Sequence, residues 1–406
     1  MIVANRLWPE ITAIRRRSAW WMNPPSPRAA TIPWALGDNG MAIGGRWIIA
    51  WWECISAIRL RASNACLAAA CTCRKIGRTT RCVEKNYVPD GVEFRTKPQI
   101  ALELIDRALG NGVGVAAWTF DELYGRDGKF LDGLERRQQA FVGEIPMDFH
   151  GWVQQPRILR SGPKKSKKRG RAKEYPRLAR RRPSCEVRNL VTYSPVFREQ
   201  SWQRYRIKDT DKGPEVWEVK WAVFWRKGEN GLPGRRHCLI VARNVLTAEV
   251  KYFVANRVPG AKGVTLRWLL RVAFGRWSVE RCFRVAKDGL GMDHYQVRGW
   301  RCVHRHFYLT QASYLFCARI RQQYDASDGQ EADRLTIEQV RSAIGTWLSA
   351  ADLRSAARRK RHEKDQNKQR YYQRRNRQAG KSHTKTKIAR FTAMGINVNQ
   401  IKSCTS

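Results

Sequence analysis

Acidic residues are scarce in this chain. Its 406 residues contain 35 Asp and Glu against 77 Lys and Arg, so the formal net charge is +42. The bases occur along almost the whole length rather than in one tail. So large an excess predicts a polyanionic partner, and nucleic acid is a commoner one than a membrane surface. A basic RNA-binding protein of the ribosomal type stays open as the alternative at this level.

Regular cysteine spacing is lacking as well. The 11 Cys form no evenly spaced framework, and no signal peptide with a basic start and an uninterrupted apolar core begins the chain. We therefore expect reduced thiols in a cytoplasmic protein. The group closest to a zinc site is Cys66, Cys71, Cys73 and Cys82. It has neither paired CxxC spacing nor a nearby His, which argues against zinc.

An uninterrupted apolar run long enough for a membrane is also missing. The most apolar stretch of this kind, residues 41–60, contains Arg46 and Glu53 in its interior. Charged side chains inside a membrane span are costly, so we expect no membrane-spanning helix and no membrane partner.

Residues 1 to about 85 lack a sustained helical or strand period. They hold seven of the 17 Trp and five of the 11 Cys, but only four acids. This composition, rich in Trp, Ala, Arg and Cys, is typical of a GC-rich coding sequence translated in the wrong frame. We interpret the segment as aberrant, and as disordered or non-native.

Regular patterns begin near residue 87. Thr96 can cap a helix that has Pro98 in its first turn and stops at the sequence Gly-Asn-Gly over 110–112. Residues 113–120 are then nearly all apolar, as in a strand buried on both faces, and this run ends on Asp121.

A second helix and a second strand follow. Apolar residues mark a helix around 130–134, and a further apolar run covers 140–146. Strand, helix and strand at these lengths predict an α/β unit with parallel strands.

The remaining chain alternates between basic and regular segments. Residues 161–183 are bounded by Pro and dense in bases, so they predict an arm that is disordered unless it meets an anion. The stretches 216–225, 237–242 and 247–254 are β-rich, and glycines make the first two a hairpin.

Helical spacing returns in the last third of the chain. It covers 265–287, and residues 309–321 form another apolar helix pattern. Residues 354–377 are polar and basic with hardly any apolar stripe, so we expect a helix that is solvated or bound to nucleic acid rather than part of a core.

One of these helix patterns places a single acid among bases. The set is Arg276, Glu280, Arg284 and Lys287. Offsets of four, eight and eleven put all four on one face of a helix. A surface held by i,i+4 ion pairs is the plainer interpretation, and each such pair contributes only a few tenths of a kcal/mol.

Asp121 suggests a second interpretation of Glu280, as one of a pair of catalytic acids. It follows the first regular strand, at the edge where open α/β sheets place ligands, although an ordinary turn aspartate fits the same position. Two separated acids in so basic a chain suggest phosphoryl transfer. That chemistry uses carboxylates to hold two divalent metals about 4 Å apart, while nearby bases hold the nucleic-acid phosphates.

Two ordered blocks carry a resemblance to a known family. The first is AWTFDELYG at 117–125, followed by FVGEIP at 141–146. The second is Arg276-x3-Glu280-x6-Lys287, followed by GLGMDHYQVRGWR and by HRH at 304–306. Together they resemble insertion-sequence DDE transposases, in particular insertion-sequence family 701 and its family 4 relatives. The resemblance runs from about residue 90 to residue 316.

The resemblance implies an α/β fold with an RNase H-like core interrupted by a β-rich insertion, which fits the gap between Asp121 and Glu280. These bacterial enzymes cut the ends of their own mobile element with a Mg2+-bound water and join the 3′ hydroxyls to target DNA. Mg2+ or Mn2+ at a two-metal site and a homodimer across paired DNA ends are the implied cofactor and assembly. No small-molecule substrate is implied.

Residue roles are carried over by position. Asp121 and Glu280 are the implied catalytic metal ligands. The bases expected to contact DNA are Arg276, Arg284, Lys287 and Arg298, together with Lys164, Lys165, Lys167, Lys168 and Arg169 of the arm. Family 4 members carry Tyr three residues before the Arg, where this chain has Ala273, so no Tyr contact is carried over.

The first Asp of the family's three carboxylates has no counterpart here. It belongs on the first strand of the core, but the only Asp before residue 89 is Asp38, which lacks an apolar strand around it. A frameshift near residue 85 accounts for this, and it predicts that the first core strands are missing and that catalysis is nearly abolished. A non-catalytic, basic DNA-binding remnant is the alternative.

Six segments summarise the expected organisation. They are an aberrant segment 1–86, the first part of the core 87–160, a basic linker 161–185, a β-rich insertion 186–258, the second part of the core with the Glu280 helix 259–322, and a basic helical or disordered tail 323–406.

Overall fold

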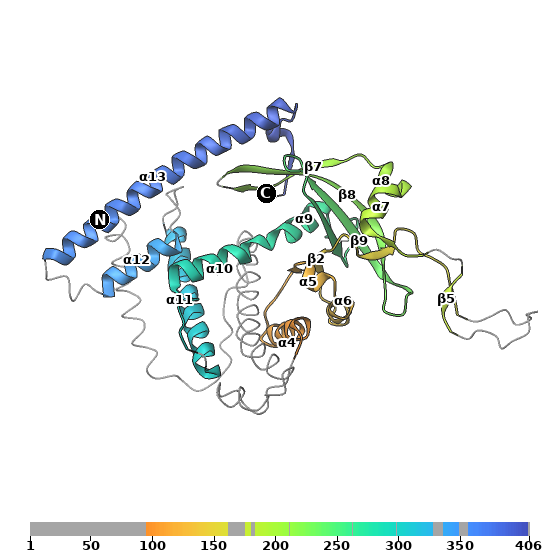
Figure 1. The fold of residues 1–406 in the computed structure, drawn as a ribbon, viewed down its shortest axis with the longest axis horizontal. Coiled ribbons are helices and arrows are strands. Elements are labelled where there is room, and N and C mark those ends of the chain that lie inside the picture. Colours follow the sequence, from red (N-terminus) through yellow and green to blue (C-terminus); the bar gives the residue numbers. More distant parts are fainter. Residues whose placement is uncertain are drawn as a thin grey trace, which may run out of the picture. The chain divides into compact units, whose positions relative to one another are not determined.

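The computed structural model describes residues 95–160, 175–179, 183–210, 212–261, 263–297, 299–327, 336–348 and 356–404. The segment 1–86, which we interpret from its composition as aberrant, the arm bases from Lys164 to Arg169 and Arg298 lie outside these residues. The chain divides into two compact units, of which one comprises Arg95–Trp277 and Arg375–Ser406 and the other includes Ser278–Arg374. Figure 1 shows the helices and strands of both. Among the described residues, none of the helices is both long and apolar enough to cross a membrane.

Helix α4 (Lys97–Gly110) begins as its sequence predicts. The Thr96 side chain accepts a hydrogen bond from the Gln99 amide, and the Gln99 side chain accepts one from the Thr96 amide. This capping box satisfies two amides that the first turn otherwise leaves without partners. The apolar stripe of α4 is buried, with Leu104 and Ala108 almost inaccessible to solvent.

The expected strand, helix and strand follow. They are β1 (Trp118–Phe120), the short helix α5 (Glu122–Gly125), α6 (Gly128–Arg136) and β2 (Phe141–Ile145). Strands β1 and β2 are parallel, in the register Trp118↔Phe141 to Phe120↔Gly143. The parallel unit is therefore confirmed. Strand β1 is shorter than the apolar run 113–120, because pairing with β2 begins only at Trp118.

The β-rich insertion joins the same sheet as the core strands. The further strands are β3 (His150–Trp152), β6 (Cys185–Glu186), β7 (Gln203–Thr210), β8 (Gly213–Lys227), β9 (Pro233–Asn244), β10 (Val250–Ala255) and β11 (Lys402–Ser403). The order is β1-β2-β10-β9-β8-β3-β6, with β7 on β8 and β11 on β7. Antiparallel pairing of β10 with β2, for example Tyr252↔Ile145, makes the insertion a continuation of the core sheet.

Smaller elements flank this sheet. They are α7 (Val187–Tyr193), α8 (Pro195–Arg198), and a separate ribbon of β4 (Ile158–Leu159) with β5 (Arg177–Leu178).

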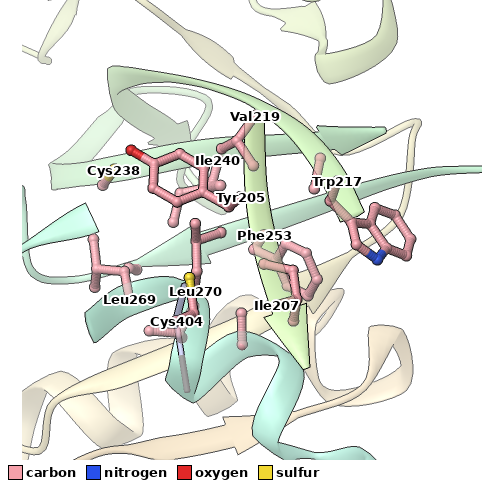
Figure 2. Close-up of a cluster of buried hydrophobic side chains, with 14 residues drawn as sticks. Tyr205, Ile207, Trp217, Val219, Cys238, Ile240, Phe253, Leu269, Leu270 and Cys404 are labelled. Carbon is pink, nitrogen blue, oxygen red and sulfur yellow. The ribbon is translucent and has the colours of Figure 1, made fainter. Parts of the chain in front are cut away.

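One face of the sheet packs on helix α9 (Leu266–Gly275). Figure 2 shows Leu269 and Leu270 of α9 among side chains from the strands, including Ile240 and Phe253. Both leucines are fully buried. Burial of this apolar surface is the main stabilising contribution to the unit.

Side-chain contacts between ionisable groups connect α6 to the β8–β9 hairpin. Glu135 of α6 contacts the fully buried His237 of β9, with 2.6 Å between Oε1 and Nε2. Asp132, one turn earlier, accepts a hydrogen bond from the guanidinium of Arg226 of β8, which is only 4% exposed. Removing one partner would leave a buried charge without compensation, so these pairs fix the insertion against the core helix.

The chain end closes the same unit. Strand β11 runs parallel to β7, and the Cys404 amide donates to the Arg206 carbonyl at 2.9 Å. Arg271 of α9 donates through Nε to the Cys404 carbonyl at 2.9 Å. Cys404 is 1% exposed and lies in the core that Figure 2 shows. The end of the expected basic tail is thus an edge strand of the sheet.

The second unit is helical. It contains most of α10 (Trp277–Leu290), with α11 (Trp300–Ser327) and α12 (Ile337–Leu348). Its core joins Cys282 and Ala286 of α10 to Phe307 of α11 and Val340 of α12. Helix α13 (Ala356–Ala393) then runs from this unit into the first.

Burial of Cys404 predicts a pH dependence of stability. It raises the pKa of the thiol to about 11, from a usual value near 9. Between about pH 9 and pH 11 the unfolded chain loses this proton while the folded chain keeps it, so the free energy of unfolding falls as the pH rises through this range and is unaffected below it. Urea midpoints at pH 8 and pH 10 should show a smaller fall in Cys404→Ala than in the wild type.

The exposed thiol of Cys302 supplies the control. Cys302→Ala should keep the wild-type difference between the two midpoints. Equal pH dependence in the wild type and in Cys404→Ala would contradict the assignment to Cys404.

Candidate active-site residues

Asp121 lies where the sequence predicts, directly after β1. It is the N-cap of α5, and its Oδ1 accepts a hydrogen bond from the Leu123 amide at 3.1 Å. Its side chain is partly exposed, and no base within the described part of the chain forms an ion pair with it. Asp121 thus has the capping role of an ordinary turn aspartate, and its carboxylate is also accessible to a further ligand.

Two glycines fix the backbone around Asp121. A Cβ on Gly125 would lie 1.9 Å from the Glu144 carbonyl oxygen of β2. A Cβ on Gly143 would lie 1.8 Å from Cε2 of Phe120, the residue before Asp121. The blocks AWTFDELYG and FVGEIP therefore interlock through positions where only glycine fits. Both blocks carry the family resemblance, but their local sequence patterns do not predict that the glycine of each block contacts the other block.

The edge of β1 opposite β2 has no strand partner among the described residues. All three residues of β1 are nevertheless buried. The backbone donors and acceptors along this edge have no strand partner, so a further core strand could pair with β1 here.

Glu280 lies in the first turn of α10 and is exposed. Arg284 is exposed and Lys287 is half-buried, and the three positions share the side of the helix opposite the buried Cys282, Ala286 and Gly289. The shared face predicted for these three residues is confirmed.

Arg276 lies between two helices. Helix α9 ends at Gly275 and α10 begins at Trp277, and Arg276 itself keeps a right-handed helical backbone (φ −53°, ψ −34°). Its place on the Glu280 face stays a prediction. Phe274 packs against Trp217 in the sheet core, with ring centroids 4.9 Å apart, whereas α10 packs into the core of the helical unit. Arg276 and Glu280 therefore belong to different units.

The two candidate carboxylates also belong to different units. Asp121 lies in the unit of Arg95–Trp277, and Glu280 in that of Ser278–Arg374. Over the described ranges, no group of three or more His, Cys, Asp or Glu side chains could hold a metal ion. Carboxylate oxygens are the donors that Mg2+ prefers, so the ligand type fits. The resemblance implies three carboxylates, and the sequence offers candidates for two of them, Asp121 and Glu280.

A second charged group, which sequence patterns did not indicate, lies on β7, β8 and β9. Trp202 has Lys220 Nζ 4.8 Å and the Arg243 guanidinium 4.5 Å from its ring centroid. Glu218 accepts hydrogen bonds from Arg243 and Arg204, which hold its pKa below the usual value although burial alone would raise it. Burial lowers the pKa of Lys220, and the Arg243 charge adds to this. These groups satisfy one another, which indicates a structural role.

Comparison with known families supports the DDE assignment. Residues 60–214 match the model of a family described as DDE superfamily endonuclease. The match includes Asp121 and both glycine-containing blocks, ends before Glu280, and begins inside the segment that composition marks as aberrant. The mixed sheet flanked by helices is consistent with an RNase H-like DDE endonuclease fold. No curated protein matches the chain.

The glycine contacts predict large losses of stability on small changes. Gly125→Ala and Gly143→Ala should each lower the free energy of unfolding by about 3 kcal/mol, near the upper end for overpacking, because a backbone carbonyl and a packed ring must move. Urea denaturation at pH 7 measures both. Gly110→Ala is the matched control, since no atom lies within 4 Å of its added Cβ and the helix gains up to about 1 kcal/mol. Three equal midpoints would refute the interlock.

The cap and the carboxylate functions of Asp121 can be separated. Asp121→Asn keeps an oxygen for the Leu123 amide, so its free energy of unfolding should stay within about 0.5 kcal/mol of the wild type. Asp121→Ala loses the cap and should cost about 1 kcal/mol. Thermal or urea unfolding distinguishes the two. If Asp121→Asn destabilised as much as Asp121→Ala, the Asn variant could not serve to test the carboxylate alone.

Proposed function

We propose that this chain is a DDE-type transposase of an insertion sequence whose catalytic set is incomplete. The supporting observation is Asp121, which ends a core strand inside the region that matches the DDE endonuclease family. The order of the two blocks, with Asp121 in the first and Glu280 on a later helix, adds to it.

Asp121 and Glu280 are the residues that would hold divalent metal, Mg2+ or Mn2+. Such a pair of ions activates the attacking oxygen and stabilises the leaving one in phosphoryl transfer. Arg284 and Lys287 lie on the Glu280 face of α10, where they would hold the phosphates of the transposon end. Arg276 precedes this helix and would contact the DNA separately, as would Arg298 and the arm bases.

The missing carboxylate makes efficient cleavage unexpected. Asp38 is the only Asp upstream of residue 89, and β1 has an unpaired edge within the described residues. Without the third ligand, both the ligand charge and the geometry of a metal pair fail. A frameshift that replaced the sequence of the first core strands would explain both observations.

The second candidate function is DNA binding without catalysis. The net charge of +42 supports it independently of any carboxylate. Metal dependence separates the two functions, since phosphate contacts by Lys and Arg need no divalent ion.

Cleavage assays on the flanking end sequences of the element test the proposal. The purified chain, in Mg2+ or Mn2+, should cut an end duplex no faster than its Asp121→Asn/Glu280→Gln variant does. A chain rebuilt with the alternative upstream frame, carrying an Asp at the end of a strand, should cut, and Glu280→Gln should abolish this activity. Glu229→Gln, on an exposed turn, is the control and should leave it unchanged.

Two results would overturn parts of the proposal. Robust cutting by the original chain that Glu280→Gln abolishes would show that the set is complete. Failure of the rebuilt, folded chain to cut would remove the transposase assignment itself.

A further inference from the structure

Helix α13 carries a charge excess that the candidate active site does not use. Its 38 residues contain 14 Lys and Arg and only two acids, Glu363 and Asp365. No acid follows Asp365 up to the last residue, Ser406. Figure 1 shows α13 as an unbroken helix.

The C-terminal end of α13 packs against the sheet unit. Phe391 is fully buried in a small core with Val216 and Ile396. Gly213, with φ +93°, lets the β7–β8 turn approach the helix, since a Cβ there would lie 3.1 Å from Thr384 Cα. These contacts anchor one end of the helix, and the described residues from 370 to 390 are mostly exposed.

The exposed positions of α13 hold a row of bases. Its members are Arg370, Arg374, Arg377, Lys381 and Lys385, all of them exposed. They recur at intervals of three or four residues, so they lie on one side of the helix. Fifteen residues separate the first from the last, which corresponds to about 22 Å of helix.

Like charges at these spacings repel one another along the helix. Beyond the row, burial lowers the pKa of Lys387, and the charges of Lys208, Arg390 and Lys212 add to this while Glu215 opposes it. No acid after Asp365 compensates within the helix. An anionic partner would relieve this repulsion by neutralising several bases at once.

Helix composition decides between kinds of anionic partner. Insertion of a helix into a membrane surface, or its packing against another helix, uses an apolar stripe. Between Lys368 and Lys387 the apolar content is Tyr371, Tyr372, Ala379 and Gly380, which form no stripe. A helix 10–12 Å wide fits the major groove of duplex DNA, which is about 12 Å wide and has phosphates on both sides.

We propose that α13 binds duplex DNA by lying in the major groove, with its row of bases on the phosphates, as an anchor that needs no metal. The inference extends the proposed function by adding a DNA-binding element remote in sequence from Asp121 and Glu280. It requires binding only, so it stands whether or not the chain cuts.

The salt dependence of binding tests the anchor. In EDTA, the affinity for a duplex of arbitrary sequence is measured between 50 and 300 mM salt. The plot of log K against log salt has a negative slope. The variant R370Q/R374Q/K381Q/K385Q should make this slope shallower by about 3–4, because each lost phosphate contact removes about 0.9 from its magnitude. Gln keeps a good helix propensity, and circular dichroism checks that α13 persists.

A matched control removes the same net charge elsewhere. The variant K97Q/K129Q/K227Q/R257Q changes four exposed bases of the sheet unit and should make the slope shallower by less than 1. Equal slopes in the two quadruple variants would overturn the proposal, since net charge alone would then explain binding. If the helix variant does not fold, Arg374→Gln and Lys381→Gln replace it, each with an expected loss of about 0.9.

Further binding measurements distinguish duplex DNA from other anionic partners, and DNA binding from cleavage. Tighter binding of single-stranded RNA than of duplex DNA, or α13-dependent binding to anionic vesicles, would overturn the choice of duplex DNA. Asp121→Asn/Glu280→Gln should bind with the wild-type slope. A chain that does not cleave DNA would therefore not contradict DNA binding by α13. If the α13 variant bound DNA like the wild type, the cleavage assignment would still stand.

Discussion

Strand β2 is the element on which the rest of the sheet depends. Its two edges form hydrogen bonds with strands of different origin, since β1 on one side belongs to the core and β10 on the other to the insertion. Gly143 in its middle leaves the space that the Phe120 ring fills, so the same strand also sets the position of Asp121. The geometry of the candidate carboxylate thus follows from the packing of one five-residue strand.

The insertion is coupled to this strand through charge as well as through backbone pairing. His237 and Arg226 are buried on the hairpin, and their carboxylate partners both come from α6. Three of these groups, Glu135, His237 and Arg226, are buried, which is costly unless each finds its partner, so these contacts favour one alignment of hairpin and helix over alternatives.

Local patterns predicted the elements near Asp121 well. The cap at Thr96, the end of α4 at Gly110 and the strand before Asp121 all follow from interactions within a few residues. Two features depend on distant contacts and were not predictable. The helical stretch around Arg276 is divided between two cores, since Phe274 packs into one and Cys282 into the other, and no Pro marks this division. The joining of the insertion to β2 is a matter of register between segments more than a hundred residues apart.

The place of β11 has a consequence for how the protein is made. Strand β7 leaves the ribosome long before residues 402–404, its partners along one edge. During that interval β7 presents unpaired backbone groups, and such edges pair readily with other chains. A chain without residues 402–404 would therefore leave Tyr205 and Arg206 of β7 without their strand partner on this edge, open to pairing with another chain.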